Sequence, residues 1–430
     1  MATYSELLKE LNRLPLGDVY QKTINGKQYF YHQYFHAGKR YSVLVKGEEL
    51  ESLRLGIARR KEVERQLKDY RPKDVTLSKN ANELTGCVMN GDRVVARFEK
   101  GALVDIDEKH CPLVIRRTHS IEKFLKLRVL DMSRTNARIL KKVLHIDVDE
   151  DYKASLYSYA LSVSDHYWFK PKHSKLTYQD VEFDNDALFD TSLKGEVNVF
   201  YHKAKLSPEL TTTGSFEKGW RYIDRQWWLY KSGNDKQFFS ELFCSRFAEL
   251  IGIPTVKYEL DHGYIRCLNF SPVYNFEPMA AIADDNEDYD YLFNLLYAMD
   301  PKLAKEYLKL IFFDTAVNNI DRHNENLGLL RDYRSGRIVS LAPNFDNNLA
   351  LIATTDSLNA NLKKDGFVEV FVRFLKKNEV AMECFKELDL KDISIYEIQG
   401  IVDSISVNTV NTNGLAEGVL ERYNYLKSFF

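Results

Sequence analysis

The amino-acid sequence predicts an α+β fold in which a sheet-rich lobe precedes a helical lobe, with a small αβ module in front of both. Short strand-like segments cluster between residues 205 and 270, and helical periodicity dominates beyond residue 288. The first 73 residues carry a hairpin signal of their own. A chain of 430 residues is long enough for two or three domains. We therefore expect a basic hairpin-plus-helix module at residues 1–73, a bridging region at 74–204 and a core at 205–430.

Composition narrows the class of protein. Hydrophobic residues make up 44% and charged residues 28% of the chain, which excludes a disordered or low-complexity protein. The formal charge of −2 excludes a broadly basic nucleic-acid binder. Five scattered cysteines suggest neither a disulfide framework nor a metal site, and no apolar run approaches the 18 residues of a membrane span. We expect a cytoplasmic protein without membrane contact.

The N-terminal module is expected to contain three strands between two helices. In chain order the segments are a helix at Tyr4–Leu11, strands at Tyr20–Ile24, Gln28–Phe35 and Tyr41–Val45, and a helix at Glu48–Tyr70. The turns are Asn25-Gly26, a strong hairpin signal, and Ala37-Gly38. Residues 1–75 hold 15 Lys and Arg against 10 Asp and Glu, so this end of the chain is basic. The charge suits a DNA contact through residues 1–73, and it equally suits a solvated docking platform.

The bridging region opens on another predicted hairpin, with strands at Leu84–Met89 and Val94–Phe98. Residues 119–146 alternate basic and apolar groups at helical spacing, and residues 155–200 are aromatic and rich in loops.

The core is expected to divide into an N-lobe at about 205–270 and a helical C-lobe at about 271–430. The N-lobe strands are Trp220–Ile223, Trp227–Lys231, Val256–Leu260 and Tyr264–Leu268, and a helix at Lys236–Ile251 interrupts them. The C-lobe helices are Tyr289–Ala298, Pro301–Asn318, Phe367–Phe385, Ile395–Ile405 and Leu415–Phe429. Such an order of lobes is the bilobal layout of protein kinases.

The segment after the long helix at Pro301–Asn318 carries the most specific chemistry. Asp321 and Asn326 are five residues apart, which is the spacing of the catalytic loop of protein kinases. The aspartate meets the attacking hydroxyl, and the asparagine reaches a metal ion on the phosphates. Asp346 follows twenty residues later and is placed like the second metal ligand. Mg²⁺ prefers such oxygen ligands, so Asn326 and Asp346 are the expected metal site.

Upstream residues complete a phosphotransfer set. Lys231 ends a strand and suits the nucleotide phosphates, while Glu241, in the following helix, is placed to pair with it. The loop from Thr211 to Gly219 is polar and contains Gly214, so it is expected to cover the phosphates. Each signal alone is weak, because a strand-end lysine or an Asp-x-x-x-x-Asn pair occurs in many proteins. Their order and separation are specific.

At these residues the sequence resembles the HipA-like serine/threonine kinases, which include the toxin kinases of bacterial toxin–antitoxin systems. The matching segments are Thr211 through Gly214 with Lys218, then Lys231, Glu241 through Gly252-Ile253, Asp321 through Asn326, and Pro343 through Asp346. The resemblance extends best from residue 205 to 350. It implies an ATP- and Mg²⁺-dependent kinase that phosphorylates a serine or threonine hydroxyl of a protein substrate, with an antitoxin as a further partner.

The resemblance also implies roles for single residues. Lys218 matches the lysine of the phosphate loop, and Arg266 and Asn269 lie where the family binds adenine. Thr211 stands in place of a serine whose autophosphorylation inactivates the family's kinases, so it is the implied autophosphorylation site. His323 matches a histidine with a structural role.

Two other interpretations stay open. The same fold acts in other enzymes on lipids or small molecules, or transfers AMP, and no residue in the chain decides the acceptor. Alternatively, the basic module makes the chain mainly a DNA- or partner-binding regulator with a vestigial kinase lobe. The complete set of Lys231, Glu241, Asp321, Asn326 and Asp346 argues against the vestigial lobe.

Overall fold

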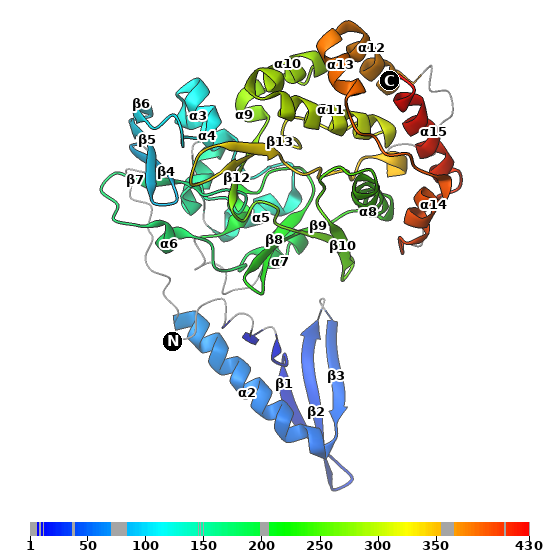
Figure 1. Ribbon diagram of the computed structural model, residues 1–430. Coiled ribbons are helices and arrows are strands. Elements are labelled where there is room, and N and C mark those ends of the chain that lie inside the picture. Colours follow the sequence, from blue (N-terminus) through cyan, green and yellow to red (C-terminus); the bar gives the residue numbers. More distant parts are fainter. Residues whose placement is uncertain are drawn as a thin grey trace.

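The computed structural model describes residues 7, 10, 11, 13–36, 39–69, 84–144, 146, 148, 150–197, 206–353, 365–407 and 410–429. Within these residues the chain forms four antiparallel sheets of three or four strands, together with α-helices and 3₁₀ turns (Figure 1). This mixture agrees with the predicted α+β class. None of the described helices is both long and apolar enough to cross a bilayer.

The first sheet has the order β1-β2-β3 and is followed by one long helix. The bounds are Asp18–Ile24 for β1, Lys27–His36 for β2, Lys39–Val45 for β3 and Gly47–Asp69 for α2. Asn25 and Gly26 link β1 to β2 with φ angles of 51° and 77°, so the predicted tight turn is confirmed. The expected turn at Ala37-Gly38 and most of the expected first helix lie outside the described residues.

The N-terminal elements pack on the next part of the chain through a small apolar cluster. In this cluster Leu7, Leu11 and Val63 are buried against Leu130, Ala137, Leu140, Ala187 and Leu188. Figure 1 shows β1–β3 and α2 projecting from the rest of the molecule.

A second sheet, of order β6-β5-β4-β7, follows in residues 86–171. Its strands are β4 (Gly86–Asn90), β5 (Arg93–Glu99), β6 (Ala102–Ile106) and β7 (Tyr167–Pro171). The helices of this part are α3 (Leu113–Thr118), α4 (Ile121–Lys126), α5 (Thr135–Val143), α6 (Tyr178–Val181) and α7 (Phe189–Lys194). The predicted hairpin at residues 84–98 is confirmed. The helical spacing at residues 119–146 corresponds to two helices, because the chain leaves the helix between Lys126 and Thr135.

The third sheet has the order β10-β11-β9-β8 and carries one helix. Its strands are β8 (Lys218–Ile223), β9 (Gln226–Lys231), β10 (Tyr258–Asp261) and β11 (Tyr264–Leu268), and the helix is α8 (Asp235–Leu250). Asn234 caps α8 by accepting a hydrogen bond from the backbone N–H of Gln237. All four predicted strands and the helix between them are present, with shifts of one or two residues at their ends.

The remaining residues are mostly helical and include a fourth sheet, β12-β13-β14, that the sequence did not predict as a unit. Its strands are β12 (Tyr274–Pro278), β13 (Gly328–Asp332) and β14 (Ile338–Leu341). The helices are α9 (Ala280–Ala283), α10 (Tyr289–Met299), α11 (Pro301–Ala316), α12 (Gly366–Lys377), α13 (Glu379–Lys386), α14 (Ile395–Asp403) and α15 (Leu415–Lys427). One prediction is wrong: Phe367–Phe385 is two helices. Asn378 ends α12 and caps α13 by accepting from Ala381 N.

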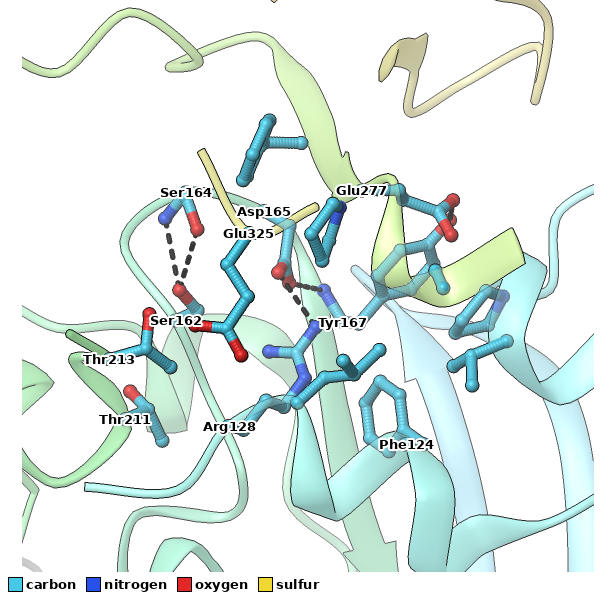
Figure 2. A pocket seen from close by; sticks show the side chains of 16 residues that line it. Phe124, Arg128, Ser162, Ser164, Asp165, Tyr167, Thr211, Thr213, Glu277 and Glu325 are labelled. Carbon is cyan, nitrogen blue, oxygen red and sulfur yellow. Dashed lines mark hydrogen bonds and ion pairs between the residues drawn. The ribbon is translucent and has the colours of Figure 1, made fainter. Parts of the chain in front are cut away.

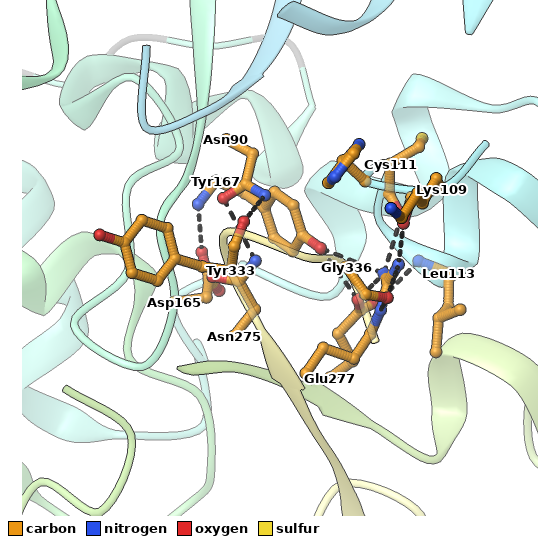
Figure 3. Close-up of polar contacts among 12 residues, drawn as sticks. Asn90, Lys109, Cys111, Leu113, Asp165, Tyr167, Asn275, Glu277, Tyr333 and Gly336 are labelled. Carbon is orange, nitrogen blue, oxygen red and sulfur yellow. Dashed lines mark hydrogen bonds and ion pairs between the residues drawn. The ribbon is translucent and has the colours of Figure 1, made fainter. Parts of the chain in front are cut away.

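Residues 84–171 share one hydrophobic core with the part of the chain from α8 onward, and this core runs from Val88 in β4 to Leu426 in α15. A buried polar network joins them as well (Figure 3). Arg331 on β13 forms an ion pair with Glu277 on β12 and donates hydrogen bonds to the carbonyl oxygens of Cys111 and Lys109, each at 2.8 Å. Glu277 also accepts from Tyr167 Oη at 3.0 Å. Arg331, Glu277, Cys111 and Tyr167 are all buried, so the contact between the two parts is specific.

Candidate functional site

A cavity of about 1050 Å³, partly open to solvent, lies between the β8–β11 sheet and the loop that follows α11. Most of the residues that the sequence singled out line it, namely Thr211, Gly214, Lys218, Lys231, Asn269, Asp321, Asn326 and Asp346. Val256, Leu229 and Phe345 add apolar walls. Such a mixture of apolar walls with a few convergent charges is typical of a ligand site. Glu241 does not line the cavity, but it forms an ion pair with Lys231, which does.

Lys231, Glu241 and Asp346 form a buried charged cluster at the base of the cavity. Lys231 Nζ lies 2.9 Å from Glu241 Oε1 and 2.8 Å from Asp346 Oδ1. Burial opposes the charge on Lys231, but the two carboxylates hold its pKa well above the usual range. The pKa of Asp346 is held well below its usual range, because Lys231 and Lys218 outweigh the effect of burial. The predicted pairing of Lys231 with Glu241 is therefore present in the geometry, with Asp346 as a third member.

Glu241 also fixes the segment that carries Asp346. Its second oxygen, Oε2, accepts from Asn347 N at 2.8 Å, and Tyr258 Oη accepts from Asp346 N at 3.2 Å. Asp346 has a φ angle of 58°, a left-handed conformation that a non-glycine residue adopts only when its surroundings support it. These two hydrogen bonds supply that support and aim the carboxylate at Lys231.

The loop after α11 is held by Arg322, which the sequence did not single out as a functional side chain. Arg322 is buried and forms a bidentate ion pair with Asp314 on α11 at 2.9 Å. It also donates to the carbonyl oxygens of Asn326 and Phe345 at 2.8 and 2.7 Å. One guanidinium thus connects the segment of Asp321 and Asn326 with the segment of Asp346. Its place inside the Asp-x-x-x-x-Asn motif was visible in the sequence, but its partners were not.

Asp321 is half-buried at the mouth of the cavity, and burial raises the pKa of its carboxyl above the usual range. Asn326 Nδ2 donates to the carbonyl oxygen of Asp321 at 3.2 Å, so the two ends of the loop face each other. His323 Nδ1 accepts from Glu325 N at 3.2 Å, which is a contact within the loop. The structural role expected for His323 agrees with this contact.

The segment from Thr211 to Lys218 covers one end of the cavity. Gly214 has a φ angle of 91°, and a side chain there would meet Lys218 Nζ, because an added Cβ would lie 2.4 Å from it. A side chain here would displace the ammonium group, and other residues rarely adopt this φ angle, so glycine permits the close approach of the lysine. The hydroxyl of Thr211 is buried and donates to the carbonyl oxygens of Leu161 and Pro208. Autophosphorylation of Thr211 stays a prediction, and it requires this segment to leave the observed position.

Lys218 faces Lys231 directly across the β8–β9 pair. Within the described chain no hydrogen-bond acceptor or ion-pair partner meets Lys218 Nζ, although the residue is only 7% exposed. Burial lowers the pKa of Lys218 to about 8; Lys231 adds to the effect and Asp346 opposes it. Like charges directly opposite each other destabilise a sheet, and so does a buried cation without a partner. Lys218 would therefore gain a counter-charge from an anionic ligand in the cavity.

The two residues expected at the adenine end differ in position. Asn269 lines the cavity and is fixed there, since its N donates to Trp227 O at 2.8 Å and its Nδ2 to Val163 O at 3.0 Å. Arg266 is not among the cavity-lining residues. Because successive side chains alternate along β11, Cys267 faces the cavity while Arg266 lies on the other face, ion-paired with Glu259 and stacked over Trp228. The geometry does not support a nucleotide contact by Arg266.

The oxygen donors in the cavity fit Mg²⁺. Asp346 and Asn326, the predicted ligands, both line it, and Asn348 lines it as well. Asn348 Oδ1 is buried and has no hydrogen-bond partner among the described residues, so it is an unsatisfied acceptor beside the predicted ligands. The described residues contain no cluster of three or more His, Cys, Asp or Glu that suits a metal. Mg²⁺ bound with phosphates usually takes only one or two carboxylates from the protein.

A second cavity continues from the first, and Ser162, Ser164, Thr211, Thr213, Phe276 and Glu325 line both. Figure 2 shows Glu325 and the hydroxyls of Ser162 and Thr213 facing this space, with Arg128 and Asp165 beyond them. Arg128 and Asp165 form a buried ion pair at 2.7 Å. The second cavity thus adjoins the end of the site where Asp321 and Glu325 lie.

Comparison with known proteins gives only distant likeness. No protein-family model and no curated protein matches the sequence. Among solved structures, the Helicobacter pylori proinflammatory kinase CtkA aligns with 50% of this chain and 90% of its own, at 18% identity and a TM-score of 0.38. A chain of the Shewanella oneidensis toxin–antitoxin complex of HipA, HipB and operator DNA aligns over 80% of this chain and 99% of its own, at 13% identity and a TM-score of 0.48. At such values the functional conclusion rests on the residues of the site.

Proposed function

We propose that this protein is an ATP- and Mg²⁺-dependent phosphotransferase that phosphorylates a serine or threonine hydroxyl of a protein. One observation carries the proposal: Lys218 and Lys231 converge with Asp321, Asn326 and Asp346 in a single cavity. Phosphoryl transfer depends on positioning and charge stabilisation more than on covalent chemistry, and these residues supply both.

The two lysines bind the phosphates. Lys231 is held in place by Glu241 and Asp346, so its ammonium is ordered before a ligand arrives. Lys218, which has no ion-pair partner among the described residues, gains one when an anionic phosphate enters. The stretch around Gly214 closes over the same end of the cavity. Because all of these groups are already in position, little reorganisation is needed on binding.

Asp321 orients the acceptor hydroxyl and accepts its proton. Burial raises the pKa of its carboxyl, which makes it a stronger base than an ordinary aspartate. The adjoining cavity gives an acceptor chain room to approach this residue.

Asn326 and Asp346 hold the metal in this proposal, with Asn348 as an additional oxygen donor. When bound, Mg²⁺ neutralises the charge that develops on the transferred phosphoryl group. Arg322 keeps the two segments that carry these ligands together.

The same proposal assigns an N-lobe and a C-lobe to the structure. The β8–β11 sheet with α8 corresponds to the N-lobe at residues 205–270, and the helices from α10 onward to the C-lobe at 271–430. The site lies where they meet, as expected for a bilobal kinase of the HipA-like type. An antitoxin partner follows from that type as a further part of the proposal.

The deciding experiment incubates the full chain with casein and ATP labelled on the γ- or the α-phosphate. We expect label from the γ-phosphate only, whereas transfer from the α-phosphate would replace this proposal with AMP transfer.

Asp321→Asn is expected to retain Mg·ATP binding by calorimetry and to lose about 10²- to 10⁴-fold in turnover. Asp346→Asn is expected to lose Mg²⁺-dependent binding.

Asp105→Asn is the matched control, because Asp105 is exposed on β6 and its closest cation, Arg97, is 3.8 Å away. It should behave like the wild type. Full phosphotransfer by Asp321→Asn, or no binding of Mg·ATP by the wild type, would sink the proposal.

A further inference from the structure

The β1–β3 sheet has two faces with different surroundings. Arg54 of α2 lies over the Phe30 ring, 5.0 Å from its centroid, which places α2 on the face that carries Phe30. Strand alternation and register assign the opposite, outer face to Asp18, Tyr20, Lys22, Ile24, Lys27, Tyr29, Tyr31, Gln33, Arg40, Ser42 and Leu44. Tyr20 and Leu44 are 51% and 53% exposed, so this face is open.

The outer face carries cations that the protein does not neutralise. Lys22 lies over the Tyr31 ring at 5.9 Å and Arg40 donates to Gln33 Oε1 at 2.6 Å, while no carboxylate of the described residues pairs with Lys22, Lys27 or Arg40. The three strands contain a single acidic residue, Asp18. Its carboxylate is already paired with Lys61 of α2 at 2.5 Å.

The cations of α2 form a contrast within the same module. Arg59, Lys61 and Arg65 pair with Glu10, Asp18 and Glu62 at 2.5 to 2.8 Å. Among the described residues of this module, ion pairs with carboxylates therefore gather on the helix, where Arg54 stacks on Phe30 instead, while Lys22, Lys27 and Arg40 of the outer sheet face have none. That asymmetry is not visible in the net charge of the chain.

The outer face also carries side chains that can form hydrogen bonds with the edges of DNA bases. Gln33 and Ser42 are direct cross-strand partners, and Arg40, Gln33 and Ser42 form one hydrogen-bonded row. Gln and Arg side chains recognise adenine and guanine edges in the major groove. Three strands spaced about 4.8 Å apart are about 10 Å across, which fits a major groove about 12 Å wide.

We infer that the outer face of the β1–β3 sheet binds duplex DNA in the major groove, with Lys22, Lys27 and Arg40 on the phosphates and Gln33 toward the bases. This binding site is separate from the phosphotransfer cavity and does not depend on it.

The test measures binding of the full chain to a fluorescent 20-base-pair duplex at several salt concentrations. Three phosphate contacts predict a log–log salt slope of about −2.7, and non-specific affinity at physiological salt is expected in the range of about 10⁻⁴ to 10⁻⁶ M. The triple variant Lys22→Gln, Lys27→Gln, Arg40→Gln should bind at least about tenfold more weakly at low salt, with a slope near zero.

The control removes charge from α2 by Arg59→Gln and Arg65→Gln, which leaves the pair of Lys61 with Asp18 intact, and it should retain the wild-type slope. A charge-preserving variant, Lys22→Arg, Lys27→Arg, Arg40→Lys, should retain binding. Circular dichroism verifies that each variant is folded. The same loss of affinity per removed charge in the helix variant and in the sheet variant would assign binding to net charge and overturn the inference, as would equal competition by single-stranded DNA or heparin, or no duplex binding at low salt.

Discussion

Lys218 shows how a single residue acquires its chemistry from its neighbours. It is the first residue of β8, it lies opposite Lys231, and Gly214 leaves room for its ammonium group. Burial leaves it with a pKa of about 8, so a modest rise in pH removes its charge. Its affinity for a phosphate therefore depends on pH in a range where ordinary lysines remain charged.

The first prediction concerns the pH dependence of kcat/KM for Mg·ATP, which reports groups in the free enzyme. We expect kcat/KM to fall as pH rises through about 8, because neutral Lys218 no longer attracts the phosphates. Lys218→Arg keeps its charge at all accessible pH values, so the alkaline fall should disappear even if the maximum rate is lower. Lys218→Met should give a low and flat alkaline limb. The same alkaline fall in Lys218→Arg would assign it to another group.

At the scale of elements, α5 holds the segment from Thr211 to Lys218 in position. Arg134, at the start of α5, is buried and donates to Thr212 O at 2.5 Å and to Lys218 O at 3.5 Å. One guanidinium thus contacts both ends of the stretch that contains Gly214. Asn136 N adds a hydrogen bond to Glu217 Oε1 at 3.1 Å. A helix outside the predicted N-lobe therefore orders the loop that covers the cavity.

The second prediction tests this positioning role with Arg134→Met. Loss of charged hydrogen bonds worth about 1.5–3 kcal/mol should raise KM for ATP by about ten- to a hundredfold. We expect a smaller change in kcat, because Asp321 and the metal ligands stay in place. Arg138→Met is the control, since Arg138 is exposed on the same helix. If the two variants had equal KM values, the loop would not depend on Arg134.

At the scale of the whole molecule, residues 84–171 and the helical part behave as one packed unit. Arg331 and Glu277 lie between them with side-chain exposures of 2% and 5%, and their contacts extend to Lys109, Cys111 and Tyr167 (Figure 3). The continuous apolar core argues for the same unity. The boundary proposed near residue 204 therefore separates segments of sequence that fold together.

The third prediction follows from the buried pair. Arg331→Met leaves Glu277 buried without its cation and should lower the free energy of unfolding by about 3–5 kcal/mol. Combining it with Glu277→Gln should recover part of the loss, because no buried charge remains. Urea denaturation measures both, and Arg334→Met, at an exposed residue whose side chain donates to Tyr333 Oη, should change stability little. A loss below about 1 kcal/mol for Arg331→Met would show that the pair does not join the two parts.

The sequence by itself determined local structure, which depends on residues that are close together in the chain. The Asn25-Gly26 turn and the four strands of the third sheet are local patterns, and they were predicted because turns and periodicity are encoded over a few residues. The division of Phe367–Phe385 into two helices at Asn378 was not predicted, because the apolar period of the sequence continues across this capping residue. The set of cavity-lining residues was also largely predictable, because motif order and spacing carry it.

Only the tertiary structure decided which distant groups meet. Strand register places Lys218 opposite Lys231 and turns Arg266 away from the cavity. Packing between segments tens of residues apart sets the contacts of Arg322 and Arg134. Charge compensation is decided in the same way, since a sequence gives the number of cations but not which of them find a carboxylate. That is why the uncompensated lysine of the cavity and the uncompensated cations of the outer sheet face emerge only from the folded chain.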